Sequence, residues 1–600
     1  MMPWSSGMTT PFKRGRFLLP LSLMTLALAG CNSGGITSAA TSLFSGGPEE
    51  VADKIKVNQV GYLPGGTKQA VVPAGKQSHF SVVNTATNRE VFRGQLTPAA
   101  HWGPSDDSVH IADFTGLKAP GEYRLQVEGL KASVRFRIDS NIYQQLNAAS
   151  IKSYYLNRSG IELLPQFAGE YARPAGHPDT RVLVHASAVS AQRPEGTVIS
   201  SPKGWYDAGD YNKYIVNSGI STYTLLSAYE HFPQHYRQQS LNIPESSNAV
   251  PDLLDEAYWN IAWMLTMQDP ADGGVYHKLT NKRFDGVIMP HEAVEPRYVV
   301  QKGTAAALNF AAVMATASRI FARYDQQFPG LSGEMLIAAE KAWRWAVANP
   351  NVAYEQPDDI KTGAYGDKQF ADEFAWAAAE LYIATRNDNY YRTFTLSNPA
   401  IGVSSWSDVS GLPWISLAHH VDNLTPAADK NLIRQTVMSE ARRLWSRSSE
   451  SAYRLPMQSE DFKWGSNSFA LNQAIMLLQG YRLSKEAAYL DAAQSLLDYT
   501  LGKNPLNTSY VTGFGERSPM HIHHRPSEAD GIRAPIPGFI SGGPNPGQQD
   551  ADDCPVPYPF AEPAKSWLDH WCSYASNEIA INWNAPLVYV SGAIQVLTAE

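Results

Sequence analysis

The sequence predicts a mainly α-helical protein that begins with a small β-sandwich. Short segments in which apolar and polar residues alternate run from Lys54 to Ile138, separated by Gly, Pro and Asn turns. Such alternation is typical of antiparallel sheets. After Asn141 the apolar residues recur every three or four positions to the end of the chain, which indicates amphipathic helices. No short repeat of fixed period occurs, so helices paired into one closed domain are favoured over a solenoid.

The composition argues against a nucleic-acid-binding function. The 600 residues carry 49 Lys and Arg against 57 Asp and Glu, a formal net charge of −8. A chain with this balance has no basic stripe to neutralise phosphates, so we expect no nucleic-acid partner. Hydrophobic residues make up 44% of the chain, enough for a large core, and there are 15 Trp and 29 Tyr. Core packing explains part of this aromatic content, and stacking on sugars would explain the rest.

The amino terminus is expected to direct export. Basic residues precede an apolar run over 17–29 that suits a secretion signal and is too short for a mature membrane helix. The run ends in Leu-Ala-Gly-Cys31, which resembles the lipobox of bacterial lipoproteins. Residues 1–31 are therefore predicted to be a lipoprotein signal peptide, with Cys31 acylated. The alternative is an ordinary cleaved signal in which Cys31 is accidental.

Residues 32–53 are rich in Gly, Ser, Ala and Thr, as in a flexible tether. We therefore expect an exported protein that is held to the cell envelope through lipid alone, at the bacterial outer membrane.

The predicted sandwich spans residues 54–139. Its clearest strands are Phe80–Val83, Glu122–Val127 and Ser133–Ile138. A length of roughly 85 residues suits an immunoglobulin-like module. Because the segment gathers no acids, histidines or nucleophile, we expect it to have a supporting role.

The predicted helical domain spans residues 141–600. In the segment from Pro251 to Leu265, apolar side chains recur along one face. Similar runs are expected to form helices at about 217–231, 303–322, 334–348, 371–386, 428–447, 466–484, 486–500 and 586–598. Long Gly- and Pro-rich segments lie between some of these helices, and periodicity alone supports no more than an all-α domain.

Two carboxylates lie in a turn before the helix expected near Asn217. Asp207 and Asp210 flank Gly209, and four aromatic rings, Tyr211 among them, surround the turn. Aspartates before a helix are usually caps. A carboxylate pair on a surface that stacks against sugar, however, is what the activation of water at a glycosidic bond requires.

A single acid, Glu578, lies near the other end of the chain, in a segment otherwise lacking charge. An isolated carboxyl among apolar and amide groups has a raised pKa and suits a general acid. The alternative is an exposed glutamate on an ordinary loop. Pro586 fits the first turn of the following helix.

Three histidines are clustered at His521, His523 and His524, followed by Arg525. Their spacing lacks the i,i+4 geometry of a helical metal site and no ligand partner is evident. Recognition of sugar hydroxyls fits better than a catalytic zinc.

Together these motifs resemble glycoside hydrolase family 9. The resemblance covers about 54–600 and rests on Asp207-Ala-Gly-Asp210, His523-His-Arg525 and Asn577-Glu578 in this order. It is supported by Trp464-Gly-Ser, by the segment 252–278, and by an opening at 56–64 that resembles the immunoglobulin-like domain preceding many such enzymes.

The resemblance implies an (α/α)6 barrel and hydrolysis of β-1,4-glucans with inversion. It implies that Asp210 is the general base, that Asp207 helps to hold the water, and that Glu578 is the general acid. An inverting pair stands about 6.5–9.5 Å apart to admit water, so the two can come from distant loops. The expected sugar contacts are His523, Arg525, Trp464, Trp583 and Tyr211.

One feature of the sequence qualifies the expected mode of cleavage. An insertion at about 531–571, containing Cys554 and preceding Cys572, could wall off one end of the cleft. The enzyme would then act from chain ends, as a cellodextrinase, β-glucosidase or exo-β-glucosaminidase, rather than as an endoglucanase. The two cysteines are expected to form one disulfide, as an exported chain allows, with two free thiols as the alternative.

No cofactor is expected for the chemistry. Several members of the family bind calcium, and Asp372-Glu373 resembles part of such a site; the alternative is an acidic pair at the start of a helix. We expect a monomer whose partner is a β-1,4-glucan or its oligosaccharides. A glycan-binding lipoprotein on an inactive scaffold is a remote alternative. The intact Asp207, Asp210 and Glu578 argue against it, because a pure binder has no need of all three carboxylates.

Overall fold

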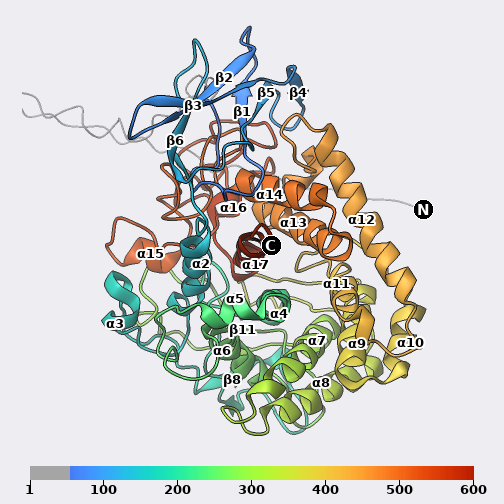
Figure 1. Ribbon diagram of the computed structural model, residues 1–600. Helices are drawn as coiled ribbons and strands as arrows, with labels where there is room; N and C mark the ends of the chain where they lie inside the picture. The colour runs from blue at the N-terminus through green and yellow to red at the C-terminus, as the bar shows by residue number, and fades with distance from the viewer. Residues whose placement is uncertain (1–53, 600) are drawn as a thin grey trace, which may run out of the picture. The chain divides into compact units, whose positions relative to one another are not determined.

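The computed structural model describes residues 54–599 (Figure 1). The predicted signal peptide 1–31, its Cys31 and the tether 32–53 lie outside the described residues.

The predicted immunoglobulin-like sandwich is confirmed. Its two sheets are antiparallel, and in Figure 1 the strands gather at one end of the helical domain. One sheet has the order β3 (Arg89–Gln95), β2 (His79–Asn84), β6 (Gly121–Gln126), β7 (Phe136–Ile138), and the other has the order β1 (Gln69–Pro73), β5 (Asp107–Asp113), β4 (Ala100–Trp102). Val82 pairs with Leu125, and both are fully buried, because alternate residues of each strand face the apolar layer between the sheets.

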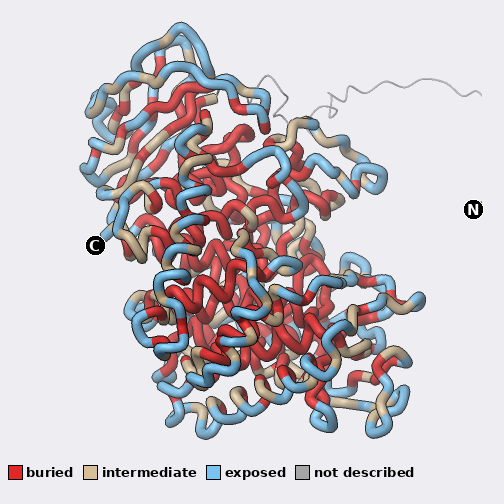
Figure 2. Tube along the Cα trace, turned by 90° about the vertical axis from the view of Figure 1, so that its right-hand side faces the viewer, coloured by how far each residue is buried: buried red, intermediate tan, exposed pale blue. Residues whose placement is uncertain are grey.

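The predicted (α/α)6 barrel is also confirmed. Six inner helices pack side by side in a closed ring, namely α4 (Ile215–His231), α7 (Thr304–Phe321), α9 (Ala371–Thr385), α11 (Leu412–His419), α13 (Ser466–Ser484) and α17 (Ile581–Leu597). Each also packs on one or more helices of an outer layer, namely α2 (Gln144–Leu156), α6 (Asp252–Thr266), α8 (Leu331–Ala348), α10 (Asp388–Leu396), α12 (Lys430–Glu450) and α14 (Ala487–Thr500). Figure 2 shows the buried residues concentrated along the helices in the middle of this domain.

Shorter elements connect the helices. They are α3 (Pro165–Ala168), α5 (Pro233–Gln238), α15 (Arg525–Ala529), α16 (Tyr574–Asn577) and a small sheet in the order β10 (Lys213–Tyr214), β11 (Lys278–Thr280), β12 (Tyr298–Val299), β8 (Val182–Val184), β9 (Val198–Ile199). Its strand β10 connects the loop of Asp207 to α4.

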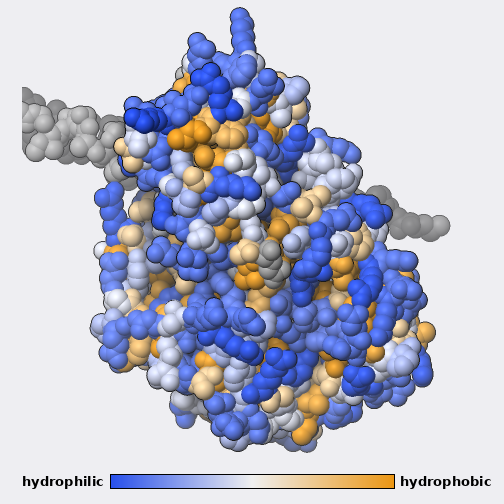
Figure 3. Space-filling view, in the orientation of Figure 1, coloured by the Kyte–Doolittle hydropathy of each residue, from blue (hydrophilic) through white to orange (hydrophobic). Residues whose placement is uncertain are grey.

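One helical segment of the described residues, Thr304–Tyr324, is long and apolar enough to cross a membrane, and 89% of its most apolar window is buried. It includes α7, whose neighbours α4, α8 and α9 cover it, so its apolarity reflects a place inside the barrel. Figure 3 shows a largely hydrophilic face with only scattered apolar areas.

Two local predictions differ from the structure. Pro586 lies inside α17, which begins five residues earlier at Ile581. The proline leaves the carbonyl of Asn582 without its usual amide donor, and the hydroxyl of Ser468 donates to that carbonyl instead (3.3 Å). Helix α2 was not expected because it buries polar side chains: Asn147 donates to the carbonyl of Val588 (2.8 Å). Apolar residues of α2 such as Leu146 and Ile151 are also fully buried in the core, so packing and hydrogen bonds together hold this helix in place.

The sandwich also contacts the insertion at 531–571. Asp107, at the start of β5, accepts an ion-pair hydrogen bond from Lys565 (2.7 Å) and a hydrogen bond from the hydroxyl of Tyr453 (3.0 Å). Trp102 packs on the Tyr453 ring with centroids 4.4 Å apart. The β4–β5 turn therefore supports a loop of the helical domain.

Candidate active site

Three loops that are far apart in the sequence meet at one end of the inner ring, and backbone hydrogen bonds join them. The amide of Ile581 donates to the carbonyl of Asp207 (2.8 Å), and the amide of Arg525 donates to the carbonyl of Gly209 (3.2 Å). The amide of His523 donates to the carbonyl of Asn577 (3.0 Å). The three predicted motifs therefore form one site.

Gly209 lies where these loops approach most closely. A Cβ atom there would lie 2.4 Å from the carbonyl oxygen of His523 and 3.1 Å from Oε1 of Glu578. The backbone of His523 would have to move to relieve such a contact, which is energetically costly, so only glycine fits at this position. The amide of Gly209 donates a hydrogen bond to Oε1 of Glu578 (3.2 Å).

Asp207 is buried behind the surface of the site, with an exposed fraction of 1%. Nδ2 of Asn217 donates to both its carboxylate oxygens (2.9 and 3.0 Å), and the hydroxyl of Tyr365 donates to Oδ2 (2.9 Å). Burial and then the charge of Asp210 raise the pKa of Asp207 well above its usual value. Neither aspartate caps α4, whose N-cap is Tyr214, so the cap interpretation does not hold.

Asp210 lines the open cleft. Its Oδ2 accepts hydrogen bonds from Nδ2 of Asn212 (2.5 Å) and from the hydroxyl of Tyr214 (3.0 Å). Both hydrogen bonds from described residues end on Oδ2, which leaves Oδ1 available to a molecule in the cleft.

Glu578 lies between α16 and α17 and also lines the cleft. Burial and then the charge of Asp210 raise its pKa well above the usual carboxyl value, against the amide of Gly209, which lowers it. Glu578 therefore holds a proton at a pH where an ordinary glutamate has lost it.

The cleft has a volume of about 1010 Å³, enough for several sugar units. Trp464, Trp583, His523 and Arg525, all predicted sugar contacts, line it. Trp464 is the most open of these rings, with 42% of its surface exposed, and lies 5.7 Å from the ring of Tyr574. Six further aromatic residues of the lining were not predicted as sugar contacts from the sequence, namely Tyr214, Phe284, Tyr365, Trp406, Phe469 and Tyr574.

Two of the predicted sugar contacts are held by their own neighbours. Nδ1 of His523 donates to the carbonyl of Trp571 (2.8 Å), and burial lowers the pKa of His523 to about 4. Its imidazole is therefore neutral, with Nε2 as an acceptor. Arg525 donates to the backbone carbonyls of Gly209 (2.6 Å) and Asp285 (2.8 Å), so it braces the loops as well as lining the cleft.

Tyr211 does not line the cleft, contrary to expectation. It is 1% exposed, and its hydroxyl donates to the carbonyl of Ile288 (2.6 Å). Its ring packs with Tyr206, Ala293 and Ile288 in a small apolar cluster. An aromatic residue next to a catalytic motif in sequence can face either the cleft or the wall behind it, and packing decides which.

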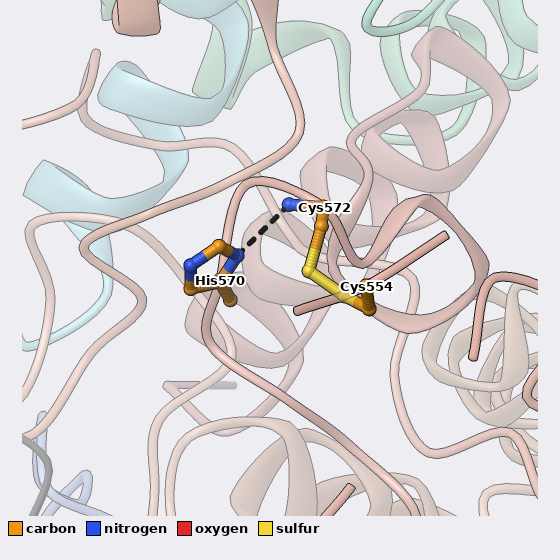
Figure 4. Close-up of side chains that lie close together, drawn as sticks. All are labelled: Cys554, His570 and Cys572. Carbon is orange, nitrogen blue, oxygen red and sulfur yellow. Dashed lines mark hydrogen bonds between the residues drawn. A yellow bond between two sulfur atoms is a disulfide. The ribbon is translucent and has the colours of Figure 1, made fainter. Parts of the chain in front are cut away.

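The insertion forms one wall of the cleft through Gln549, and the hydroxyl of Tyr574 donates to the Gln549 carbonyl (3.3 Å). Cys554 and Cys572 are joined in a disulfide that closes this loop (Figure 4). His570 lies beside them and its Nδ1 accepts a hydrogen bond from the Cys572 amide (3.1 Å). Because both sulfurs are bonded to each other, this trio is not a metal site.

Within the described residues, a second cluster of metal-ligand type comprises Glu230, His419 and His420. Arg319 forms an ion pair with Glu230, and Arg482 donates to Nδ1 of His419 (2.7 Å). Arginine side chains therefore already hold two of its three candidate ligand groups.

Asp372 and Glu373 occupy the first turn of α9. Oδ2 of Asp372 accepts a hydrogen bond from the Val409 amide (2.8 Å). Oε2 of Glu373 and Oδ2 of Asp367 are buried with no hydrogen-bond partner. Burial, then the charge of Asp372, raises the pKa of Glu373 well above its usual value. Carboxylate oxygens that lack donors in this way fit a hard cation.

The chain is similar to known glycoside hydrolases over nearly all its described length. The sequence model of glycosyl hydrolase family 9 matches residues 143–591, and that of the cellulase N-terminal Ig-like domain matches residues 50–132. The xyloglucan-specific endo-β-1,4-glucanase BoGH9A of Bacteroides ovatus is 43% identical over 91% of this chain and 94% of its own.

A cellulose 1,4-β-cellobiosidase of Acetivibrio thermocellus is 35% identical over 90% of this chain and 66% of its own. The solved structure named Bacteroides ovatus GH9 superimposes with a TM-score of 0.85 at 41% identity, over 91% of this chain and all of that one.

Proposed function

The chain belongs to glycosyl hydrolase family 9 and is an inverting hydrolase of β-1,4-glucans, and on this premise we propose that Asp210 is its general base and Glu578 its general acid. The observation that carries the assignment is the difference between the two carboxyl environments. Glu578 has a raised pKa and suits the proton donor. Asp210 accepts two hydrogen bonds on one oxygen and offers the other to the cleft.

The proposed reaction needs no cofactor. Oδ1 of Asp210 takes a proton from water while the water oxygen forms a bond to the anomeric carbon. Glu578 gives its proton to the glycosidic oxygen, and the bond from that oxygen to the anomeric carbon breaks. The new hydroxyl lies on the opposite face of the sugar from the departing group. Asp207 is proposed to hold the loop and the water, through Asn217 and Tyr365.

The test compares Glu578→Gln with Asp210→Asn on a β-1,4-glucan and on a cellobioside with an acidic phenol as leaving group. A reactive leaving group departs without protonation. Glu578→Gln should therefore lose about 10³-fold of its activity on the glucan and far less of its activity on the phenyl glycoside. Asp210→Asn should lose activity on both substrates, because the water must still be activated in each case. Normal glucan hydrolysis by either variant would overturn the assignment.

We propose that the enzyme acts inside chains rather than at their ends. The volume of about 1010 Å³ and the aromatic rings along the cleft suit a run of sugars rather than one terminal unit. The named relatives include a xyloglucan-specific endo-β-1,4-glucanase, and we propose xyloglucan and plain β-1,4-glucans as substrates. The wall made by Gln549 keeps an exo-acting glucosidase or glucosaminidase as the second candidate.

Product lengths separate these candidates. Xyloglucan, cellohexaose and chitosan hexamer would be digested in parallel, with polymer viscosity recorded. Mixed early products and a rapid fall in viscosity support endo action. Release of only glucose, cellobiose or glucosamine would replace it by exo action and would identify the sugar.

We further propose a structural calcium ion held by Asp367, Asp372 and Glu373. The two buried carboxylate oxygens without donors support it. The ion would pin the start of α9 and the segment that carries Tyr365, two residues before Asp367.

We also propose that the protein is an exported monomer, anchored through a lipid on Cys31. The signal and lipobox pattern of residues 1–31 supports this. Labelling of expressing cells with a clickable fatty acid should mark the native protein and not Cys31→Ser. Light scattering of the soluble part should give the mass of one chain.

A further inference from the structure

Lys278 carries a buried ammonium group whose hydrogen bonds all go to neutral acceptors. It is 0% exposed, and its Nζ donates to Oε1 of Gln356 (3.1 Å), Oγ1 of Thr362 (3.0 Å) and the carbonyl of Gly363 (2.6 Å). A buried charge without a contacting counter-ion is costly, which calls for an explanation. We propose that Lys278 is a positioning residue for hydrolysis, whose charge behind Tyr214 strengthens the hydrogen bond that the Tyr214 hydroxyl donates to the base Asp210.

The small sheet places Lys278 beside the base through Tyr214. Strands β10 and β11 are antiparallel, and their register pairs Tyr214 directly with Lys278. Nζ of Lys278 lies 5.5 Å from the centre of the Tyr214 ring. The hydroxyl of the same ring donates to Oδ2 of Asp210 (3.0 Å). A cation near the ring draws electron density from the phenol, so its hydroxyl becomes a better donor to the carboxylate.

A second chain of hydrogen bonds reaches the same oxygen. Thr362, which accepts from Lys278, shares a hydrogen bond with Thr280 (2.6 Å). The single proton of the Thr280 hydroxyl can go to Oδ1 of Asn212 (3.1 Å) or to the carbonyl of Asn281 (2.8 Å), and Nδ2 of Asn212 donates to Oδ2 of Asp210 (2.5 Å). Because the Asn281 amide also donates to Oδ1 of Asn212 (2.9 Å), Asn212 is held by backbone as well as by a neighbour of Lys278.

The charge of Asp210 acts on every carboxyl group around it. After burial, it is a cause of the raised pKa of Asp207, Glu578 and Asp285. Arg525, on α15, acts on Glu578 and Asp285. Lys278 is the cation whose own pKa responds to the charge of Asp210.

The tyrosine and histidine side chains that pack here are uncharged. Burial raises the pKa values of Tyr214 and Tyr365 and raises that of Tyr354 above its usual value. Burial lowers the pKa of His277 to about 3 and that of Lys278 to about 7. Lys278 therefore carries its charge in acidic solution.

Lys278 does not belong to the residues that line the cleft. It acts on the base from behind, so its loss should leave substrate binding unchanged. An unchanged KM would distinguish Lys278 from a residue that contacts sugar.

The experiment measures the pH profiles of kcat/KM and kcat on a β-1,4-glucan for the full chain and for Lys278→Gln. Glutamine removes the charge and keeps a donor for Thr362. We expect the midpoint of the acid limb to rise by about one pH unit. One unit below the wild-type midpoint, kcat/KM should therefore fall roughly tenfold, while the KM and the rate above the midpoint change less than about twofold.

The matched control is Lys213→Gln, on the neighbouring strand. Lys213 is also fully buried, but its Nζ is paired with Asp179 (2.7 Å). This variant should lose stability without moving the acid limb. The proposal would be overturned if the midpoint of the acid limb in Lys278→Gln equalled that of the wild type, or if it shifted equally in both variants.

Lys278→Arg keeps the proposal testable if Lys278→Gln does not fold. It retains the charge, so its acid limb should stay at the wild-type midpoint even if kcat falls. A shifted limb in Lys278→Arg would contradict a role through charge.

The inference rests on the proposed role of Asp210, and the two fail in different ways. If Asp210→Asn remains active, the assignment of the base is wrong. If Asp210→Asn is inactive and the limb of Lys278→Gln does not move, only the role of Lys278 is wrong.

Discussion

The amide of Gly209 donates a hydrogen bond of 3.2 Å to Oε1 of Glu578, which lies 369 residues further along the chain. This contact joins the loop of the proposed base to the proposed acid without any intervening side chain. The spacing of the two carboxyl groups therefore depends on backbone geometry at a single glycine.

Gly209→Ala should lower kcat by about 10²-fold and change the KM little, because displacing the loop misaligns the reacting groups. The new Cβ would lie 2.4 Å from the carbonyl oxygen of His523. Gly286→Ala is the control, since its Cβ would meet no atom within 4 Å. Steady-state kinetics of both variants test this, and an active Gly209→Ala would show that the loops have room to separate.

The rate should fall on the alkaline side at a higher pH than an ordinary glutamate would allow. The pKa of Glu578 is raised, and the acid must be protonated to act, so activity persists until the pH passes the raised value. In Glu578→Gln, assayed on the phenyl glycoside, this limb should vanish. A limb that remains unchanged would assign it to another group.

The same raised pKa has a consequence for stability. In the folded state Glu578 holds its proton more tightly than in the unfolded chain, so its stabilising contribution is complete below the unfolded pKa and is lost as the pH rises through the folded pKa. Glu578→Gln should therefore melt about 2 °C higher than wild type at pH 8, with a smaller difference near pH 4. Melting curves at both pH values measure this, and a lower melting temperature at pH 8 would contradict it.

Trp464→Ala should raise the KM for cellohexaose about tenfold, the loss expected of one stacked aromatic ring. Trp464 is 42% exposed in the cleft, whereas Trp445 is 38% exposed on α12, outside the cleft lining. Trp445→Ala is therefore the matched control and should leave the KM unchanged. Equal effects of the two variants would argue against stacking at Trp464.

Removal of calcium should lower the melting temperature. A ligand present at 100 times its Kd stabilises the folded state by about 2.7 kcal/mol. Protein treated with a chelator should regain its melting temperature with added calcium, and Glu373→Gln should show no response to either. An identical melting curve with and without chelator would refute the calcium site.

The motifs around Asp207, Asp210 and Glu578 could be identified from the sequence because their residue types and order are local properties of the chain. The helices α13 and α14 were predicted within one residue for a similar reason: one face of each is apolar along its whole length. Helix α2 was not predicted, because it buries polar side chains whose hydrogen bonds the sequence does not reveal. Asn147 donates to the carbonyl of Val588, more than 400 positions away, and Ser150 donates to the carbonyl of Asn147 in the preceding turn.

The lining of the cleft was harder to predict than its catalytic centre. Trp406 and Phe284 come from loops that carry no motif, and only the packing of the loops directs them into the cleft. Tyr211, which lies within a motif, faces the opposite way and is buried. Exposure of an aromatic ring depends on every element packed around it, so its neighbours in sequence do not determine it.

The sequence by itself determined the two fold classes, their order and the chemical groups available for hydrolysis, because periodicity and motif order are properties of the chain alone. Only the tertiary structure decided which groups meet. It brought Gly209 against Glu578, turned Tyr211 away from the cleft, and set Lys278 across the strand from Tyr214. These relationships arise when distant segments exclude water from a shared space, and the resulting burial gives the carboxyl groups their different affinities for a proton.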